Sequence, residues 1–164
     1  MLRKYFLSFV TIVMVLGASI APVYAQQSGG QQGLTTMPLE VISTSEGSIK
    51  FLVELAVSYE QQRLGMMYRT HLDPDKGMFF IYGEPGRRGY WMKDCLIYLD
   101  IIYIREDGRI ANIIRNATPG DETPRYSRGP VLAVLEIAGG RAKELGIKPG
   151  DRVVHSIFKL EKPE

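Results

Sequence analysis

Short apolar stretches in which buried and exposed positions alternate dominate the chain after residue 36. Phe51, Val53 and Leu55 recur with the two-residue period of a strand that has one buried face. Turn residues separate this stretch from similar ones, so the pattern predicts about eight strands. Their ranges are residues 37–44, 48–57, 77–82, 90–94, 99–105, 109–115, 131–137 and 152–160.

Two segments have the signals of helices instead. Ser58, followed three residues later by Gln61, forms a capping box, and apolar residues continue at helical spacing from Leu64. A second, shorter helix is predicted over residues 140–145, where Gly146 provides a C-terminal stop. The pattern therefore predicts two short helices.

Tight turns indicate how the strands pair. Glu46-Gly47 and Asp107-Gly108 are hairpin signals, and few crossover helices separate the remaining strands. Such spacing favours antiparallel pairing. We expect a mainly β chain that forms a single compact antiparallel barrel or sandwich with two short helices over residues 37–160.

The N-terminus has the features of a secretory signal peptide. Arg3 and Lys4 precede an uncharged apolar run over residues 5–20, and Val23-Tyr24-Ala25 has the small-x-small pattern of a cleavage site. An uncleaved anchor is the alternative, but the run is shorter than the roughly 20 residues of a spanning helix. We expect a signal peptide over residues 1–25, a flexible tail over 26–36, and a periplasmic or extracellular protein with no stable membrane anchor.

Charge and histidine content narrow the partner classes. Removing residues 1–25 takes away two basic residues and no acid, which leaves no net charge on the mature chain. Neutrality argues against nucleic-acid binding. His71 and His155 are the only histidines and have no metal-ligand spacing, so we expect neither a metal nor a cofactor.

Cys95 is the only cysteine, so an exported form would fold without an internal disulfide. It could be a nucleophile or a small, half-buried apolar side chain. Since no histidine lies near it in sequence to activate it, we favour the packing role.

Two acids lie within apolar strands, where a free carboxylate would be costly. If Asp100 and Glu136 met, one could have a raised pKa and act as a general acid in a small hydrolase or transferase of envelope material. Alternatively each is a structural acid that pairs with Arg63, Arg69 or Lys93. We favour the structural role, and we expect Asp100 to be mostly buried and within hydrogen-bond reach of a backbone amide or of Arg63, Arg69 or Lys93.

Cations, hydroxyls and large apolar side chains occur together in three distant segments. If these segments converge, they make a concave site with apolar walls and a few fixed polar groups. We therefore expect a binding module, rather than an enzyme, for a small anionic or hydroxyl-rich ligand or an envelope component. The candidate ligand-binding residues are Arg63, Met67, Arg69, Trp91, Lys93, Tyr126 and Ser127.

Several motifs, taken together, match a known family. They are Arg63-Leu64-Gly65-Met66-Met67-Tyr68-Arg69, Gly77-Met78-Phe79-Phe80, Trp91-Met92-Lys93, Leu99-Asp100-Ile101, Tyr126-Ser127, Leu135-Glu136 and Gly140 through Gly150-Asp151.

With these motifs, residues 37–160 resemble the bacterial and archaeal domain-of-unknown-function 192 family. The resemblance implies a compact β-rich domain, often exported, with no established catalytic residues. Family members usually carry Asn-Thr where this chain has Asp94-Cys95, and Pro where it has Tyr98. The first departure is a further argument against a chemical role for Cys95.

Overall fold

The computed structural model describes residues 29–158, which form nine strands and two short helices. The strands are β1 (Thr36–Ser43), β2 (Gly47–Ala56), β3 (Lys76–Gly86), β4 (Gly89–Tyr90), β5 (Leu99–Ile104), β6 (Ile110–Ala117), β7 (Arg125–Tyr126), β8 (Val131–Ala138) and β9 (Arg152–Val154), and the helices are α1 (Tyr59–Leu64) and α2 (Arg141–Glu144). The mainly β prediction with two short helices is confirmed.

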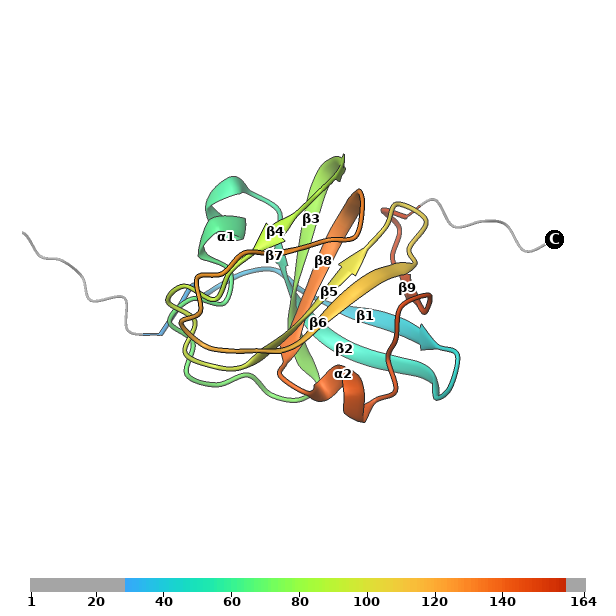
Figure 1. Ribbon diagram of the computed structural model, residues 1–164, viewed down its shortest axis with the longest axis horizontal. Helices are drawn as coiled ribbons and strands as arrows, with labels where there is room; N and C mark the ends of the chain where they lie inside the picture. Colours follow the sequence, from blue (N-terminus) through green and yellow to red (C-terminus); the bar gives the residue numbers. More distant parts are fainter. Residues whose placement is uncertain (1–28, 159–164) are drawn as a thin grey trace, which may run out of the picture.

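Seven strands form one sheet in the order β6-β5-β8-β3-β2-β1-β9, and β4 pairs with β7 in a separate ribbon (Figure 1). Most pairs are antiparallel as expected, but β2 and β3 run parallel. The expectation of an all-antiparallel sheet is therefore wrong at this pair. The parallel pairing of β2 with β3 follows from the connection through α1, because parallel neighbours need a crossover that returns the chain to the same end of the sheet.

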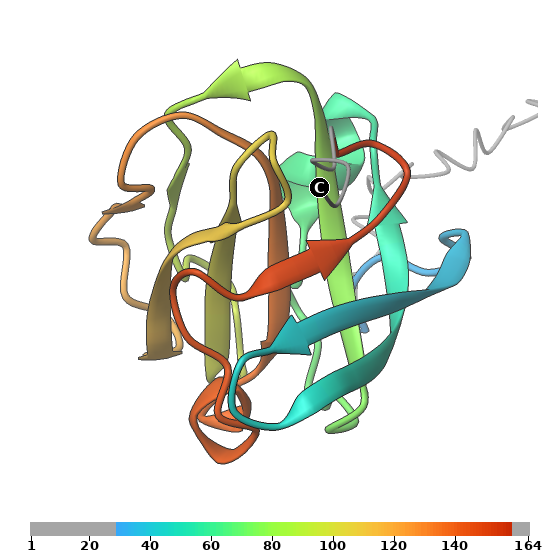
Figure 2. The same cartoon turned by 90° about the vertical axis from the view of Figure 1, so that its right-hand side faces the viewer.

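The large sheet folds over on itself without closing. Within residues 29–158, the ends of its two edge strands meet at a single isolated bridge between Arg109 and Arg152 and do not pair along a ladder of several residues. Figure 2 shows β9 lying beside β1 at one side of the folded sheet. The fold is therefore sandwich-like, and the alternative of a closed barrel is not what the chain adopts.

The strands β3, β5 and β8 are buried on both faces and separate two apolar cores. Along β5, Ile102 and Ile104 face the core that lies against β1, β2 and β9. Ile101 and Tyr103 face a second core together with Met66 and residues that follow β4. Since side chains alternate along a strand, one strand supplies both cores.

The local differences from the predicted elements concern where the elements end. The helical spacing expected to continue from Leu64 does not form helix, since α1 ends at Leu64. The strand expected over residues 90–94 is only Gly89–Tyr90, because Met92 bonds to the loop residues Gly120 and Asp121 instead of continuing the ladder. The last strand, expected over residues 152–160, ends at Val154. The signal peptide expected over residues 1–25 lies outside the described residues. No helix within residues 29–158 is long and apolar enough to cross a membrane.

Asp100 on β5 joins three segments of backbone. One carboxylate oxygen accepts from the amides of Asn116 (2.6 Å) and Gly140 (2.9 Å), and the other accepts from the amide of Ala142 (2.7 Å). The side chain is fully buried, as expected, and it is satisfied by backbone donors. Asp100 therefore ties β5 to the end of β6 and to the start of α2.

Replacing Asp100 with Ala should lower the free energy of unfolding by roughly 3–5 kcal/mol, because it leaves three backbone amides without their acceptor. Urea unfolding followed by circular dichroism measures the loss. Asp75→Ala is the matched control, because Asp75 is exposed; it should change stability by no more than about 0.5 kcal/mol. Equal effects of the two substitutions would contradict the structural role of Asp100.

Candidate functional site

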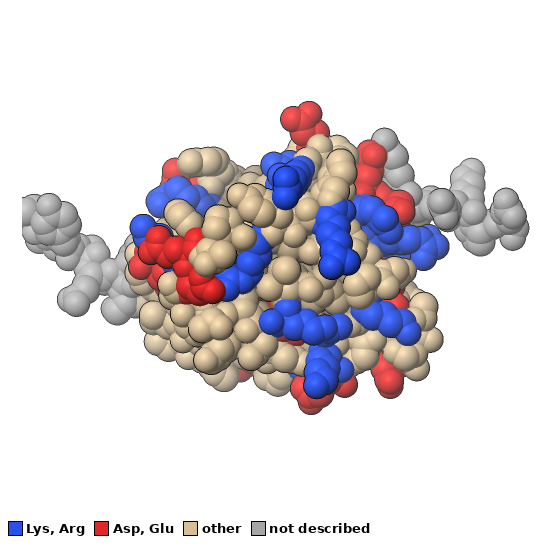
Figure 3. Space-filling model, in the orientation of Figure 1, with Lys and Arg blue, Asp and Glu red and all other residues tan. Residues whose placement is uncertain are grey.

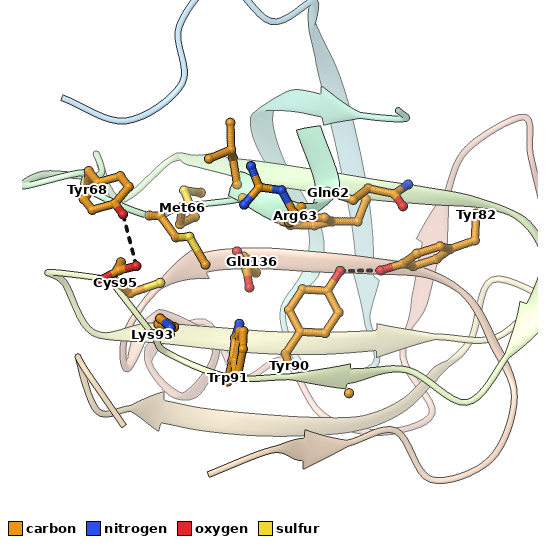
Figure 4. A pocket seen from close by; sticks show the side chains of 16 residues that line it. Gln62, Arg63, Met66, Tyr68, Tyr82, Tyr90, Trp91, Lys93, Cys95 and Glu136 are labelled. Atoms are coloured by element: carbon orange, nitrogen blue, oxygen red, sulfur yellow. Dashed lines mark hydrogen bonds between the residues drawn. The ribbon is translucent and has the colours of Figure 1, made fainter. Parts of the chain in front are cut away.

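A pocket of about 470 Å³ lies on the face of β3 and β8 that carries the second core. It is located between the α1 segment and the segment that follows β4 (Figure 4). Its lining combines aromatic rings and thioethers with two cations and two acids. Pockets of this size with few polar groups are the usual form of a small-molecule site. It is therefore the candidate functional site.

The first wall of the pocket is the end of α1. The helix begins at Ser58, whose side chain accepts from the amide of Gln61, as the capping box predicts. It ends at Gly65, where an added Cβ would lie 3.3 Å from the Phe80 ring and where φ is +45°. Only glycine tolerates both conditions, and this tight turn places Arg63 and the two following methionines along the pocket.

The second wall is the segment after β4. Met92 is fully buried, and its amide donates to Asp121 O at 2.9 Å. This anchor leaves Trp91 and Lys93 on the outside, where Trp91 is 47% exposed. The Lys93 ammonium lies 5.6 Å from the Trp91 ring centroid, so the aromatic surface and the cation form one feature of the rim.

A pair of strained residues holds the two walls together. Tyr68 and Asp94 both have positive φ angles, +63° and +55°. The Tyr68 amide donates to Asp94 O at 2.8 Å, and its hydroxyl donates to Asp94 Oδ2 at 3.0 Å. Such strain persists only where surrounding contacts enforce it and is concentrated at functional sites.

Glu136 forms the floor of the pocket. The cross-strand neighbours of Glu136 are Met78 on β3 and Ile101 on β5, and Glu136 is only 4% exposed. Within residues 29–158 it has no hydrogen-bond or salt-bridge partner. Burial raises the pKa of its carboxyl from about 4.5 to about 8, although the positive charge of Arg69 opposes the rise. At neutral pH the floor therefore carries a protonated carboxyl group.

Two tyrosines close one end of the pocket. The hydroxyls of Tyr82 and Tyr90 lie 2.6 Å apart, and the Arg88 guanidinium stacks 3.8 Å from the Tyr82 ring centroid. The Tyr90 ring also packs edge-on against Phe80 at 5.2 Å. Burial raises the pKa of both tyrosines, so they remain hydrogen-bonding phenols at physiological pH.

Cys95 also lines the pocket, and its surroundings make it a poor nucleophile. The residue is 7% exposed, and burial, with smaller effects from Glu136 and Asp94, raises the pKa of its thiol to about 12. Because the thiolate is the reactive form, this cysteine stays in its unreactive form at neutral pH.

Four of the predicted ligand-binding residues converge on this pocket. Arg63 and Met67 belong to the first wall, and Trp91 and Lys93 to the second. Figure 4 shows Arg63 and the pair of Trp91 and Lys93 on opposite sides of Glu136.

Three other predicted residues do not line the pocket. Arg69 pairs with Glu54 and donates to a backbone carbonyl of the N-terminal segment. Tyr126 lies under the Arg87 guanidinium at 4.6 Å, and the hydroxyl of Ser127 donates to Gly129 O at 2.7 Å. Arg69 therefore stabilises β2, a strand inside the large sheet, and Tyr126 and Ser127 stabilise the β4–β7 ribbon.

The hypothesis of an Asp100–Glu136 pair is wrong. In the pairing of β5 with β8, Asp100 lies opposite Ile137 and Glu136 lies opposite Ile101. The two carboxyl groups therefore point to opposite faces of the sheet. The alternative that cations satisfy both acids also fails, since Asp100 accepts from backbone amides and Glu136 has no ionic partner in the described residues.

Sequence reasoning missed several pocket residues, namely Gln62, Met66, Tyr68, Tyr82, Tyr90 and Asp94. The alternation of Met78, Phe80 and Tyr82 on β3 was a usable signal, because it places all three on the face that carries the pocket. No sequence signal indicated the contact between Tyr68 and Asp94. The contact depends on a left-handed backbone conformation at both residues, which lie in separate loops.

The described residues contain no group of three or more His, Cys, Asp or Glu side chains that could hold a metal ion. On the face shown in Figure 3, the Lys and Arg side chains of the described chain lie in several groups, with uncharged surface and acidic side chains between them. This face therefore lacks the continuous basic stripe that is typical of nucleic-acid binding.

Residues 41–155 match the model of DUF192, a family described as Uncharacterized ACR. The chain belongs to the DUF192 family. No curated protein matches the chain significantly. The family is of unknown function, so its name identifies the fold but assigns no activity to the pocket.

Two solved structures are similar to this member of the DUF192 family. A protein of unknown function from Novosphingobium aromaticivorans is 44% identical, covers 84% of this chain and 91% of its own, and has a TM-score of 0.73. A protein from Sinorhizobium meliloti named as a candidate transcription regulator is 38% identical, covers 79% of this chain and 100% of its own, and has a TM-score of 0.75.

The raised pKa of Glu136 predicts a specific pH dependence of stability. Between about pH 4.5 and 8 the unfolded chain ionises this carboxyl while the folded protein keeps it protonated. The contribution of Glu136 to stability is therefore complete below about pH 4.5 and is lost as the pH rises to about 8. Glu136→Gln should remove this loss, which amounts to roughly 5 kcal/mol by pH 9.

Urea unfolding at pH 5, 7 and 9 compares the pH dependence in wild type, Glu136→Gln and the control Glu84→Gln, whose side chain is exposed. The control should follow the wild type. If wild type and Glu136→Gln have parallel pH profiles, the carboxyl is not desolvated in the folded protein.

Cys95 should react with iodoacetamide at pH 8 at least about 1,000-fold more slowly in the folded protein than in urea, because both access and thiolate fraction are low. Mass spectrometry of timed samples measures the two rates. Rates within a factor of about ten of each other would indicate an accessible, activated thiol.

Proposed function

We propose that this protein is an exported binding module that takes a small anionic or hydroxyl-rich ligand into the pocket above Glu136. The proposed export rests on the N-terminal charge, apolar run and cleavage pattern of residues 1–25. The proposed binding rests on one observation: Arg63 and Lys93 reach the same apolar pocket from two separate walls.

Both cations are available to a ligand. Arg63 has an ion pair with Glu60 at 3.0 Å, but their side chains are 54% and 66% exposed. Such an exposed pair contributes little and is readily exchanged for a ligand. Lys93 has no acidic partner within residues 29–158, and its ammonium group lies 5.6 Å from the Trp91 ring centroid. An anion between the two walls would meet both side chains.

The apolar lining favours a ligand with a carbon body as well as a charged head. Met66 is fully buried and Met67 half-buried in the first wall, and the exposed Trp91 ring lies across from them. Thioether side chains adapt to varied shapes, and an exposed tryptophan offers a large flat surface at little cost in conformational freedom. Hexanoate is therefore a suitable first probe, together with gluconate as a hydroxyl-rich anion and glucose as a neutral sugar.

Lys93→Ala and Arg63→Ala should each weaken binding of hexanoate or gluconate at least tenfold, because each removes one of two charge-assisted contacts. Titration of the ¹⁵N-labelled protein, residues 26–164, followed by amide chemical shifts measures affinity and locates the bound probe. Neither variant should lower the melting temperature by more than about 2 °C, because both side chains are exposed.

Lys50→Ala and Arg105→Ala are the matched controls, since both side chains are exposed and lie on other strands or turns. They should bind like the wild type. Unchanged binding in Lys93→Ala and Arg63→Ala, or shifts confined to residues outside the pocket, would overturn the proposed site.

A further inference from the structure

We propose that the pocket takes a zwitterionic small molecule of the amino-acid type, whose ammonium group reaches Glu136 while its carboxylate stays between Arg63 and Lys93. This inference rests on the proposed function, because it uses the same pocket and the same two cations. It adds the chemical class of the ligand.

The first argument is the separation of charge with depth. Glu136 is 4% exposed and lies on a central strand, whereas the Arg63 side chain is 54% exposed. Figure 4 shows the Glu136 carboxyl group between the wall of Arg63 and the wall of Trp91 and Lys93. The pocket therefore has an acidic floor and a cationic rim, which matches a molecule with opposite charges at its two ends.

The second argument is the missing partner of Glu136. A buried carboxyl group normally makes hydrogen bonds, as Asp100 does on the other face of the same sheet. Glu136 has none within residues 29–158, and Met78 and Ile101 flank it on the neighbouring strands. An ammonium group supplies both the donors and the charge that this carboxyl lacks, whereas a hydroxyl supplies only a single donor.

The third argument is the aromatic surface around the floor. Phe80 and Tyr90 line the pocket, and their rings are perpendicular with centroids 5.2 Å apart. The faces of aromatic rings attract cations, and this attraction is strongest where water is excluded. An anion would gain nothing from these ring faces, so they favour the ammonium end of a ligand near the floor.

Binding of an ammonium group to Glu136 would be coupled to loss of its proton. The charged or titratable groups around Glu136 are Arg69, Arg63, Lys93, Asp94, Cys95 and the tyrosines Tyr68, Tyr82, Tyr90 and Tyr103.

Burial raises the pKa of the Cys95 thiol to about 12 and that of Tyr103 above its ordinary range, so neither group titrates between pH 6 and 8. His71 and His155 do not line the pocket. An alkyl ammonium keeps its proton up to a pH of about 10.4. A pH dependence of binding in this window therefore reports on Glu136.

The test compares three probes of equal chain length: 6-aminohexanoate, hexanoate and hexylamine. Fragments of this size bind with a Kd of roughly 1 mM, so amide shifts are followed up to about 50 mM at constant ionic strength. At pH 7.5, 6-aminohexanoate should bind at least tenfold more tightly than either singly charged probe. Its Kd should fall up to about tenfold per pH unit from pH 6 to 8, because each complex releases the Glu136 proton.

Glu136→Gln should reduce the affinity for 6-aminohexanoate to the variant's own affinity for hexanoate and should remove the pH dependence. If this variant does not fold, the wild-type pH profiles of the three probes still decide the question. Hexanoate binding as tightly as 6-aminohexanoate, with no pH dependence in either, would overturn the zwitterion proposal and leave the anion-binding function standing. Failure of all three probes to bind would overturn both.

Discussion

Burial of both faces of β3, β8 and β5 is the constraint on which the rest of this structure depends. A strand that is covered on each side has no solvent-facing positions, so a charged side chain on it needs a special environment. Asp100 meets this requirement through three backbone amides. Glu136, on the opposite face, meets it by remaining protonated at the floor of a pocket. Two acids that look alike in sequence therefore have different roles.

The pocket exists because the second core is incompletely filled by regular structure. Within residues 29–158, a short helix and loops around Met66 and Met92 pack over this face of β3 and β8. The close approach of Gly65 to Phe80 and the paired backbone of Tyr68 and Asp94 fix these loops in place. A fixed set of loops over a central strand gives the site rigid walls, which reduces the entropic cost of binding.

The sequence predicted those features that depend on local chemistry. Alternation predicted most strands, the capping box at Ser58 predicted the start of α1, and the apolar surroundings of Asp100 predicted its burial. Sequence could not predict the parallel pairing of β2 with β3, which depends on where the crossover returns the chain. Nor could it predict that Asp100 and Glu136 diverge, because that depends on the register between β5 and β8.

The central claim is that Glu136 is a desolvated, protonated recognition group at the floor of the pocket. The most direct measurement is the ¹³C chemical shift of its side-chain carboxyl in ligand-free protein, followed from pH 4 to pH 10 and assigned with Glu136→Gln. This account predicts that the carboxyl titrates near pH 8. A midpoint near the ordinary value of about 4.3 would mean that water or a cation reaches the carboxyl, and it would contradict the account.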